Sequence, residues 1–204
     1  MAGEDMHEKG REGLHRAKQW LDRSTRVAQS WPSSDRALGE FLHFQWPDAS
    51  GTFSFDLGGK LRGGTLAGRT FVAEIKNYTK ELDLATHFRD FQAKSYVAYC
   101  AKPDRCDVLM WISWSPFKAR SWDEHTTPAS VRKAILDPAN RYRVLKEEDL
   151  DRASAQLNEE AVVEVSRRLW MITLCERQEE LVISDEHMGE LMKYMQVSGG
   201  GTWE

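Results

Sequence analysis

The chain has 204 residues, 41% of them hydrophobic and eight of them tryptophan, which is enough for one core domain with an appendage. The sequence has no run of 18 apolar residues, which excludes a membrane-spanning helix, and its polar N-terminus predicts no secretory signal. Three cysteines without Cys-x-x-Cys spacing argue against a zinc site or a disulfide framework, so we expect a cytoplasmic protein with reduced thiols.

The net charge of −4 is spread unevenly along the chain. Residues 1–122 hold 18 Lys and Arg against 15 Asp and Glu, whereas residues 123–204 hold 10 against 17. We therefore expect a mildly basic core, 1–122, and an acidic helical extension, 123–204, packed on it. A basic core is compatible with a nucleic-acid partner.

Residues 5–29 are predicted to form a helix, because apolar residues recur at helical spacing. That stripe consists of Leu14, Ala17, Leu21 and Ala28. Glu8 and Glu12 lie four residues apart on a flank away from the stripe. Pro32 and the Ser and Asp residues after it end the helix.

Phe53 to Leu57 and Phe71 to Lys76 are predicted to be two strands, because apolar and polar residues alternate with period two in both. Before them, Glu40 to Trp46 is the candidate first strand of the sheet. In the predicted antiparallel hairpin, one face collects apolar side chains and the other collects polar ones. The apolar face comprises Phe53, Phe55, Leu57, Phe71, Ala73 and Ile75. The opposite face gathers Asp56, Glu74 and Lys76.

Two carboxylates beside a lysine suit the metal-dependent hydrolysis of a phosphodiester. Mg²⁺ prefers oxygen ligands and needs only one or two carboxylates in addition to substrate phosphate. A bound metal lowers the pKa of its water, and a nearby lysine orients that water or offsets charge on the phosphate. The other interpretation is a solvated strand face, because Glu-x-Lys is a common tripeptide.

The spacing of Asp56 and Glu74-Ile75-Lys76 resembles the PD-(D/E)xK, or restriction-endonuclease-like, nuclease superfamily. Phe55 stands where that motif usually has proline, and the resemblance covers about residues 5–120. It implies an α/β fold with an α-β-β-β-α-β core, a mixed central sheet and, here, added C-terminal helices. It also implies a Mg²⁺ or Mn²⁺ site at Asp56, Glu74 and Ile75. A first-helix glutamate often joins this site, and Glu12 is the candidate, with Glu8 next.

The predicted hairpin loop, Gly58 to Thr65, is rich in glycine, which lets the backbone approach a ligand closely. In and after it, Lys60, Arg62 and Arg69 are candidate phosphate contacts. A plain hairpin tip is the alternative. The loop lacks the spacing of a P-loop.

Residues 82–101 are predicted to form a helix whose apolar stripe packs on the sheet. The stripe is Leu84, Phe88, Phe91 and Ala98. Gln92 and Tyr96, one turn apart, are similar to the Gln-x-x-x-Tyr motif of the RecB-type branch of these nucleases. The similarity implies a place near the active site in contact with DNA, whereas an ordinary helix rim explains the pair equally well.

Asp107 to Ile112 is a short apolar run between prolines, which indicates a strand buried on both faces. Because it follows a helix, we expect it to lie parallel to the strand before that helix. Beyond it we expect a short helix that Thr127-Pro128-Ala129-Ser130 starts and that runs through Leu136, a second helix over about 159–179 and a last one capped by Ser184. They either form a second layer or hold a partner subunit.

Two functions follow from these patterns. The first is a metal-dependent DNA nuclease acting in phage defence, restriction or mobile-element biology. The second is a catalytically inactive nuclease fold that binds DNA or a protein partner. DNA is the expected partner in both, a partner protein or a homodimer is open, and no membrane is involved.

Overall fold

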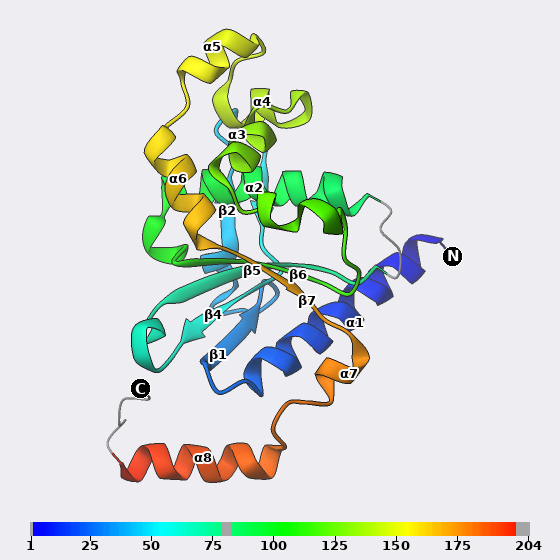
Figure 1. The fold of residues 1–204 in the computed structure, drawn as a ribbon, viewed down its shortest axis with the longest axis vertical. Helices are drawn as coiled ribbons and strands as arrows, with labels where there is room; N and C mark the ends of the chain where they lie inside the picture. Colours follow the sequence, from blue (N-terminus) through cyan, green and yellow to red (C-terminus); the bar gives the residue numbers. More distant parts are fainter. Residues whose placement is uncertain (1, 79–82, 199–204) are drawn as a thin grey trace.

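The computed structural model describes residues 2–78 and 83–198. A five-stranded sheet in the order β1-β4-β5-β6-β7 lies between helices on both faces (Figure 1). The strands are β1 Val27–Pro32, β4 Leu57–Leu61, β5 Thr70–Lys76, β6 Val108–Ser113 and β7 Leu169–Thr173, with β2 His43–Gln45 and β3 Thr52–Ser54 in a separate pair. The helices are α1 Ala2–Asp22, α2 Leu84–Ala101, α3 Pro128–Leu136, α4 Pro138–Leu145, α5 Leu150–Ala155, α6 Glu159–Arg168, α7 Glu176–Glu179 and α8 Asp185–Val197.

The central sheet is mixed. Strand β4 pairs antiparallel with both β1 and β5, whereas β6 lies parallel to β5 and β7 parallel to β6. The expected α/β class with a mixed sheet is therefore confirmed. The predictions of α2 and of β6 as a strand buried on both faces and parallel to β5 are also confirmed.

Each face of the sheet carries its own apolar core. On the α1 face, Ala17 and Leu21 pack with side chains of β4, β5 and β6, including Ala73. On the other face, Phe88 and Phe91 of α2 pack with side chains that include Val72, Leu109 and Trp111. Because alternate residues of a strand point to opposite faces, Glu74 and Lys76 lie on the same side as Val72, under α2.

The hairpin differs from its prediction. The strand that pairs with β5 is β4, whose Gly58 and Gly59 had indicated a loop. A Cβ on Gly58 would meet Leu42 Cδ2 at 2.4 Å, and one on Gly59 would meet the ring of Phe71 at 2.4 Å. These glycines therefore permit close packing on both faces of a strand, which is one of the roles of glycine within sheets.

The apolar residues before β4 also differ from the prediction. Phe53 lies in β3, and both Phe53 and Phe55 belong to the core under α2. Leu57 belongs to the core on the α1 face. The expected single aromatic face is therefore wrong, because the chain turns between Phe55 and Leu57 on leaving the small sheet.

The first strand of the sheet was also misplaced. The helix predicted over 5–29 ends at Asp22, and residues 27–32 form the edge strand β1. The candidate strand from Glu40 to Trp46 is instead a 3₁₀ turn followed by β2, which pairs with β3. Pro32 is compatible with β1 because an edge strand leaves backbone groups unpaired.

The segment 123–204 is not purely helical. Residues 159–179, predicted as one helix, divide into α6 and the sheet strand β7. Helices α3, α4 and α6 pack against α2. The boundary after residue 122 stays a prediction, but the sheet itself includes a strand from beyond it.

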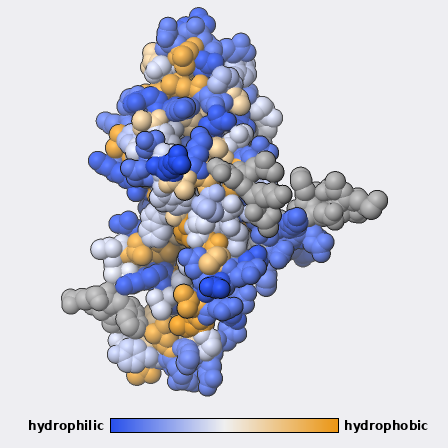
Figure 2. Space-filling view, turned by 45° about the vertical axis from the view of Figure 1, so that its right-hand side comes forward, coloured by the Kyte–Doolittle hydropathy of each residue, from blue (hydrophilic) through white to orange (hydrophobic). Residues whose placement is uncertain are grey.

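The last helix, α8, is nearly unpartnered. Ser184 caps it as predicted, since its side chain accepts a hydrogen bond from the His187 N–H at 3.2 Å. None of its described residues is buried. Figure 2 shows apolar side chains gathered at this end of the molecule, and the exposed ones include Leu181, Met192, Tyr194 and Val197. Within the described chain, every helix is too short or too polar to cross a bilayer.

Candidate active site

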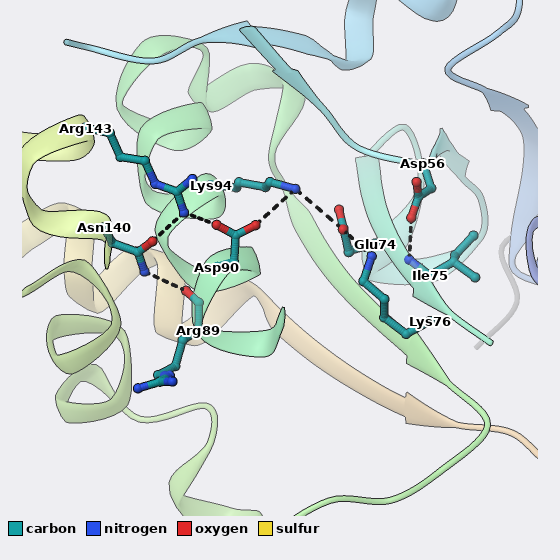
Figure 3. Close-up of polar contacts among 9 residues, drawn as sticks. All are labelled: Asp56, Glu74, Ile75, Lys76, Arg89, Asp90, Lys94, Asn140 and Arg143. Carbon is teal, nitrogen blue, oxygen red and sulfur yellow. Dashed lines mark hydrogen bonds and ion pairs between the residues drawn. The ribbon is translucent and has the colours of Figure 1, made fainter. Parts of the chain in front are cut away.

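Asp56 is held at the entrance to β4 by hydrogen bonds on both sides. Its N–H donates to the Ala73 carbonyl at 3.0 Å, and its carbonyl accepts from the Ser33 N–H at 3.1 Å. Its carboxylate Oδ2 accepts from the Ile75 N–H at 2.7 Å (Figure 3). The backbone of β5 therefore fixes this carboxylate beside Glu74.

Glu74 is a buried carboxylate, only 5% exposed, in the middle of the sheet. Lys76 Nζ donates to its Oε1 at 2.7 Å, and Lys94 Nζ of α2 lies 3.5 Å from the same oxygen. The second oxygen, Oε2, is buried and has no hydrogen-bond partner within the described part of the chain. A buried polar atom of this kind points to an ion, a water or a functional role.

Lys94 is positioned by a second layer of charges. Its Nζ lies 3.3 Å from Asp90 Oδ2 one turn earlier on α2, and Asp90 Oδ1 pairs with Arg143 of α4. Arg143 also donates to Asn140. Figure 3 follows this chain of contacts from α4 to Glu74. It anchors the α2 side of the site.

The surroundings raise the pKa values of Asp56 and Lys76, the two groups that flank Glu74. Burial, followed by the charge of Glu74, raises the pKa of Asp56 to about 6. Burial alone would lower the pKa of Lys76, but the negative charges of Glu74 and Asp56 outweigh it and raise that pKa. At neutral pH Asp56 is therefore mostly ionised, beside a lysine that keeps its proton.

A cleft of about 350 Å³ opens at the carboxyl end of β5, between this cluster and α1. Its lining includes Lys9, Arg11, Asp56, Lys76, Asn77 and Tyr78. Gly13 lets α1 approach closely, because a Cβ there would meet Asn77 Cβ at 2.5 Å. Carboxyl ends of strands are the usual place for ligands in open α/β sheets.

The first-helix glutamates lie beside the cleft rather than within the carboxylate cluster. The side chain of Glu12 is 59% exposed, with Oε2 3.5 Å from Asn77 Nδ2 and Oε1 4.0 Å from Arg16. Glu8 is exposed as well. Glu12 is thus near the rim of the site, and its predicted catalytic role stays a prediction.

The structure separates Lys60, Arg62 and Arg69 from the carboxylates. They lie toward the opposite end of β4 and β5, four to six residues along the chain from Asp56 or Glu74, which is about 13–20 Å of strand. Arg62 donates to the Thr25 carbonyl at 3.0 Å and contacts Met192 Sδ at 2.9 Å. These side chains therefore do not join the cleft.

Gln92 and Tyr96 hold α2 against the helices beyond residue 123. Gln92 Nε2 donates to the His125 carbonyl at 2.9 Å and to Ser130 Oγ at 3.0 Å. The Tyr96 hydroxyl accepts from the Asn158 N–H at 3.0 Å, and burial raises its pKa to about 12. Their polar groups are thus occupied by packing contacts and both side chains are buried, so their predicted contact with DNA stays a prediction.

Sequence reasoning missed Lys94, Asn77 and Tyr78. The signal for Lys94 was its place three residues after Phe91, which puts a lysine at the border of the buried stripe of α2. A lysine in that position needs an anion, and Glu74 and Asp90 are the anions that lie near it. Asn77 and Tyr78 had no pattern that singled them out.

The donor set fits a hard divalent cation. Among residues 2–78 and 83–198, no group of three or more His, Cys, Asp or Glu side chains converges. However, Mg²⁺ typically takes one or two protein carboxylates and completes its shell with water and phosphate. Asp56 and Glu74 form such a pair, and the unpartnered Oε2 of Glu74 offers a free ligand atom.

Comparisons with protein-family models, with curated proteins and with solved structures found no match to this chain. Its function is therefore argued from the site alone.

Proposed function

We propose that the chain is a metal-dependent nuclease of the PD-(D/E)xK type that hydrolyses phosphodiester bonds of DNA. The observation that carries the proposal is the cluster of Asp56, Glu74 and Lys76 at the end of β5, in which one buried Glu74 oxygen has no hydrogen-bond partner among the described residues. Apart from the separate pair β2 and β3, the elements follow one another as α1, β1, β4, β5, α2 and β6, an order similar to the α-β-β-β-α-β core of that superfamily, which supports the proposal.

In this proposal the carboxylates of Asp56 and Glu74 hold Mg²⁺ or Mn²⁺, with Ile75 beside them. When bound, the ion supplies a water of lowered pKa and polarises the phosphoryl oxygen. Lys76 keeps its proton, because nearby carboxylates raise its pKa, so it offsets charge that develops on the phosphate. Lys94 limits the repulsion between the two carboxylates by neutralising part of the Glu74 charge.

A plasmid-nicking assay tests the proposal. Supercoiled DNA is incubated with the full chain in Mg²⁺, in Mn²⁺ and in excess chelator. We expect nicking only with metal, and its loss in Glu74→Gln, which keeps the side-chain volume but removes the charge. Glu160→Gln, which changes an exposed carboxylate on α6, is the matched control and should nick normally. Cleavage in chelator, or equal cleavage by Glu74→Gln, would refute the metal mechanism.

The second candidate is a nuclease fold without turnover that binds DNA or a protein partner. One observation favours it: Glu74 Oε1 is already paired with two lysines, so the carboxylate is neutralised without a metal. This candidate predicts that DNA binding is the same in chelator and in Mn²⁺ and that no nicking occurs.

A further inference from the structure

The wall of the cleft opposite the carboxylates is basic. Lys9 and Arg11 come from the first half of α1, and neither forms an ion pair with another described residue. Asn77 Nδ2 donates to the Lys9 carbonyl at 3.1 Å, which fixes this part of α1 against the end of β5. Two unpaired cations beside a cleft are suited to phosphates that follow one strand.

The floor of the cleft beyond Lys76 is aromatic. Tyr78 lines it, and its ring stacks on His87 with centroids 5.6 Å apart and planes 25° apart. Burial, followed by the charge of Lys76, lowers the pKa of His87, so the imidazole is neutral at pH 7. The Tyr78–His87 pair is thus an uncharged aromatic platform close to the Lys76 ammonium.

The size of the cleft restricts what enters it. A volume of about 350 Å³ lies at the lower end of the range of small-ligand pockets. A volume of this size accommodates part of one strand rather than both strands of a duplex. An unpaired nucleotide, with its phosphate toward Lys76 and its base on Tyr78, matches both the volume and the lining.

We propose that Tyr78, backed by His87, is a stacking subsite for one unpaired base, with Lys9 and Arg11 contacting the phosphates of the same strand. The preferred substrate is therefore a single strand, an unpaired end or a locally unpaired stretch such as negative supercoiling opens in a plasmid, not fully paired duplex. This inference rests on the proposed nuclease function and names the form of substrate that the site takes. Stacking on aromatic side chains is the common way in which unpaired bases are held.

Binding in chelator tests the subsite separately from catalysis. Fluorescence anisotropy with the full chain compares a labelled 12-nucleotide DNA strand, the RNA of the same sequence and the blunt DNA duplex. We expect the single strand to bind more tightly than the duplex. Tyr78→Leu, which keeps apolar volume but removes the ring, should weaken single-strand binding by roughly 5- to 150-fold, the range for one base stack. Tyr78→Phe should bind like the native chain.

Two further variants make the test specific. Tyr142→Leu changes an exposed tyrosine on α4, away from the cleft, and should leave binding unchanged. Lys9→Ala with Arg11→Ala should reduce the salt slope by about 0.7 for each lost phosphate contact. Equal binding of RNA with the same Tyr78 dependence supports the subsite but contradicts DNA as the preferred substrate.

The failure of this inference and the failure of the nuclease proposal give different results. Nicking with tight duplex binding that Tyr78→Leu leaves unchanged would overturn the subsite alone. Tyr78-dependent single-strand binding with no cleavage in Mg²⁺ or Mn²⁺ would support the subsite and refute the nuclease.

Discussion

The surroundings of Asp56 and Lys76 raise both pKa values, for Asp56 through burial and for Lys76 through the nearby carboxylates. The two side chains are therefore suited to different roles in the proposed reaction. The buried Asp56 carboxylate titrates at a pKa of about 6, whereas Lys76 keeps its proton. Asp56 should therefore need to ionise before it binds metal, and Lys76 should act through its charge.

Lys76→Ala should slow DNA cleavage by on the order of 100-fold, as for a lost electrostatic stabiliser. Metal affinity should be nearly unchanged, since Glu74 keeps its ion pair with Lys94. Single-turnover cleavage and a Mn²⁺ titration of the same variant measure the two quantities. Lys133→Ala, at an exposed position on α3, is the control. An unaltered rate would make Lys76 a solvated strand residue.

The metal-free protein should lose stability as the pH rises from about 4 to about 6. The folded pKa of Asp56, about 6, exceeds its reference value of 3.8, so the native state binds more protons in this window and rising pH favours unfolding. The free energy at stake is at most about 3 kcal/mol. Asp56→Asn should flatten this dependence and raise the free energy of unfolding at pH 7.5, measured by urea titration in chelator. If Glu148→Gln on the surface does the same, Asp56 is not the group responsible.

Helices and strands were predicted correctly from the sequence where their apolar pattern matches the way they are packed. The helix α2 and the strand β6 were predictable because their apolar patterns match their burial. The strand β4 was not, because Gly58 and Gly59 are required by close neighbours that only the fold brings together. The strand β7 was hidden because its Leu169 and Ile172 continue the helical spacing of α6. Asp56, Glu74 and Lys76 come together because the Asp56 N–H pairs with the Ala73 carbonyl, while period-two alternation puts Glu74 and Lys76 on one face of β5.

Gly59→Ala should destabilise the fold by about 1–3 kcal/mol, the usual cost of overpacking. Its Cβ would lie 2.4 Å from the Gln29 carbonyl oxygen and from the ring of Phe71. Gly189→Ala on α8 meets open space and should not lower the free energy of unfolding. Thermal unfolding compares the two variants, and Gly59→Ala should have the lower melting temperature. Equal melting temperatures would contradict the position of β4 within the sheet.

At the scale of the whole molecule, the acidic second part of the chain is built into the fold. It supplies the strand β7 beside β6, and its helices α3 and α6 cover the α2 core through side chains that include Val131 and Val165. The charge contrast between 1–122 and 123–204 is therefore not that of a core and a free tail. Helix α8, which buries no described residue, has the character of an appendage.

A chain truncated after Trp122 should be insoluble or unfolded, because β6 loses its neighbour β7 and the apolar core around α2 is exposed. A chain ending at Ile183, which lacks α8, should keep the native circular dichroism spectrum apart from one helix. Comparison of the two truncations by solubility and circular dichroism tests this. A folded, active 1–122 fragment would show that the second part is a separate module.

The proposed function requires that Asp56 and Glu74 bind a divalent metal ion. The most direct measurement is the anomalous scattering of Mn²⁺ in crystals of the protein soaked with the ion. We predict a peak about 2 Å from carboxylate oxygens of both residues, including the Glu74 Oε2 that lacks a partner. Glu74→Gln crystals should lose it. A native crystal in Mn²⁺ whose peak lies elsewhere, with Glu74 still bound only to Lys76 and Lys94, would contradict the account.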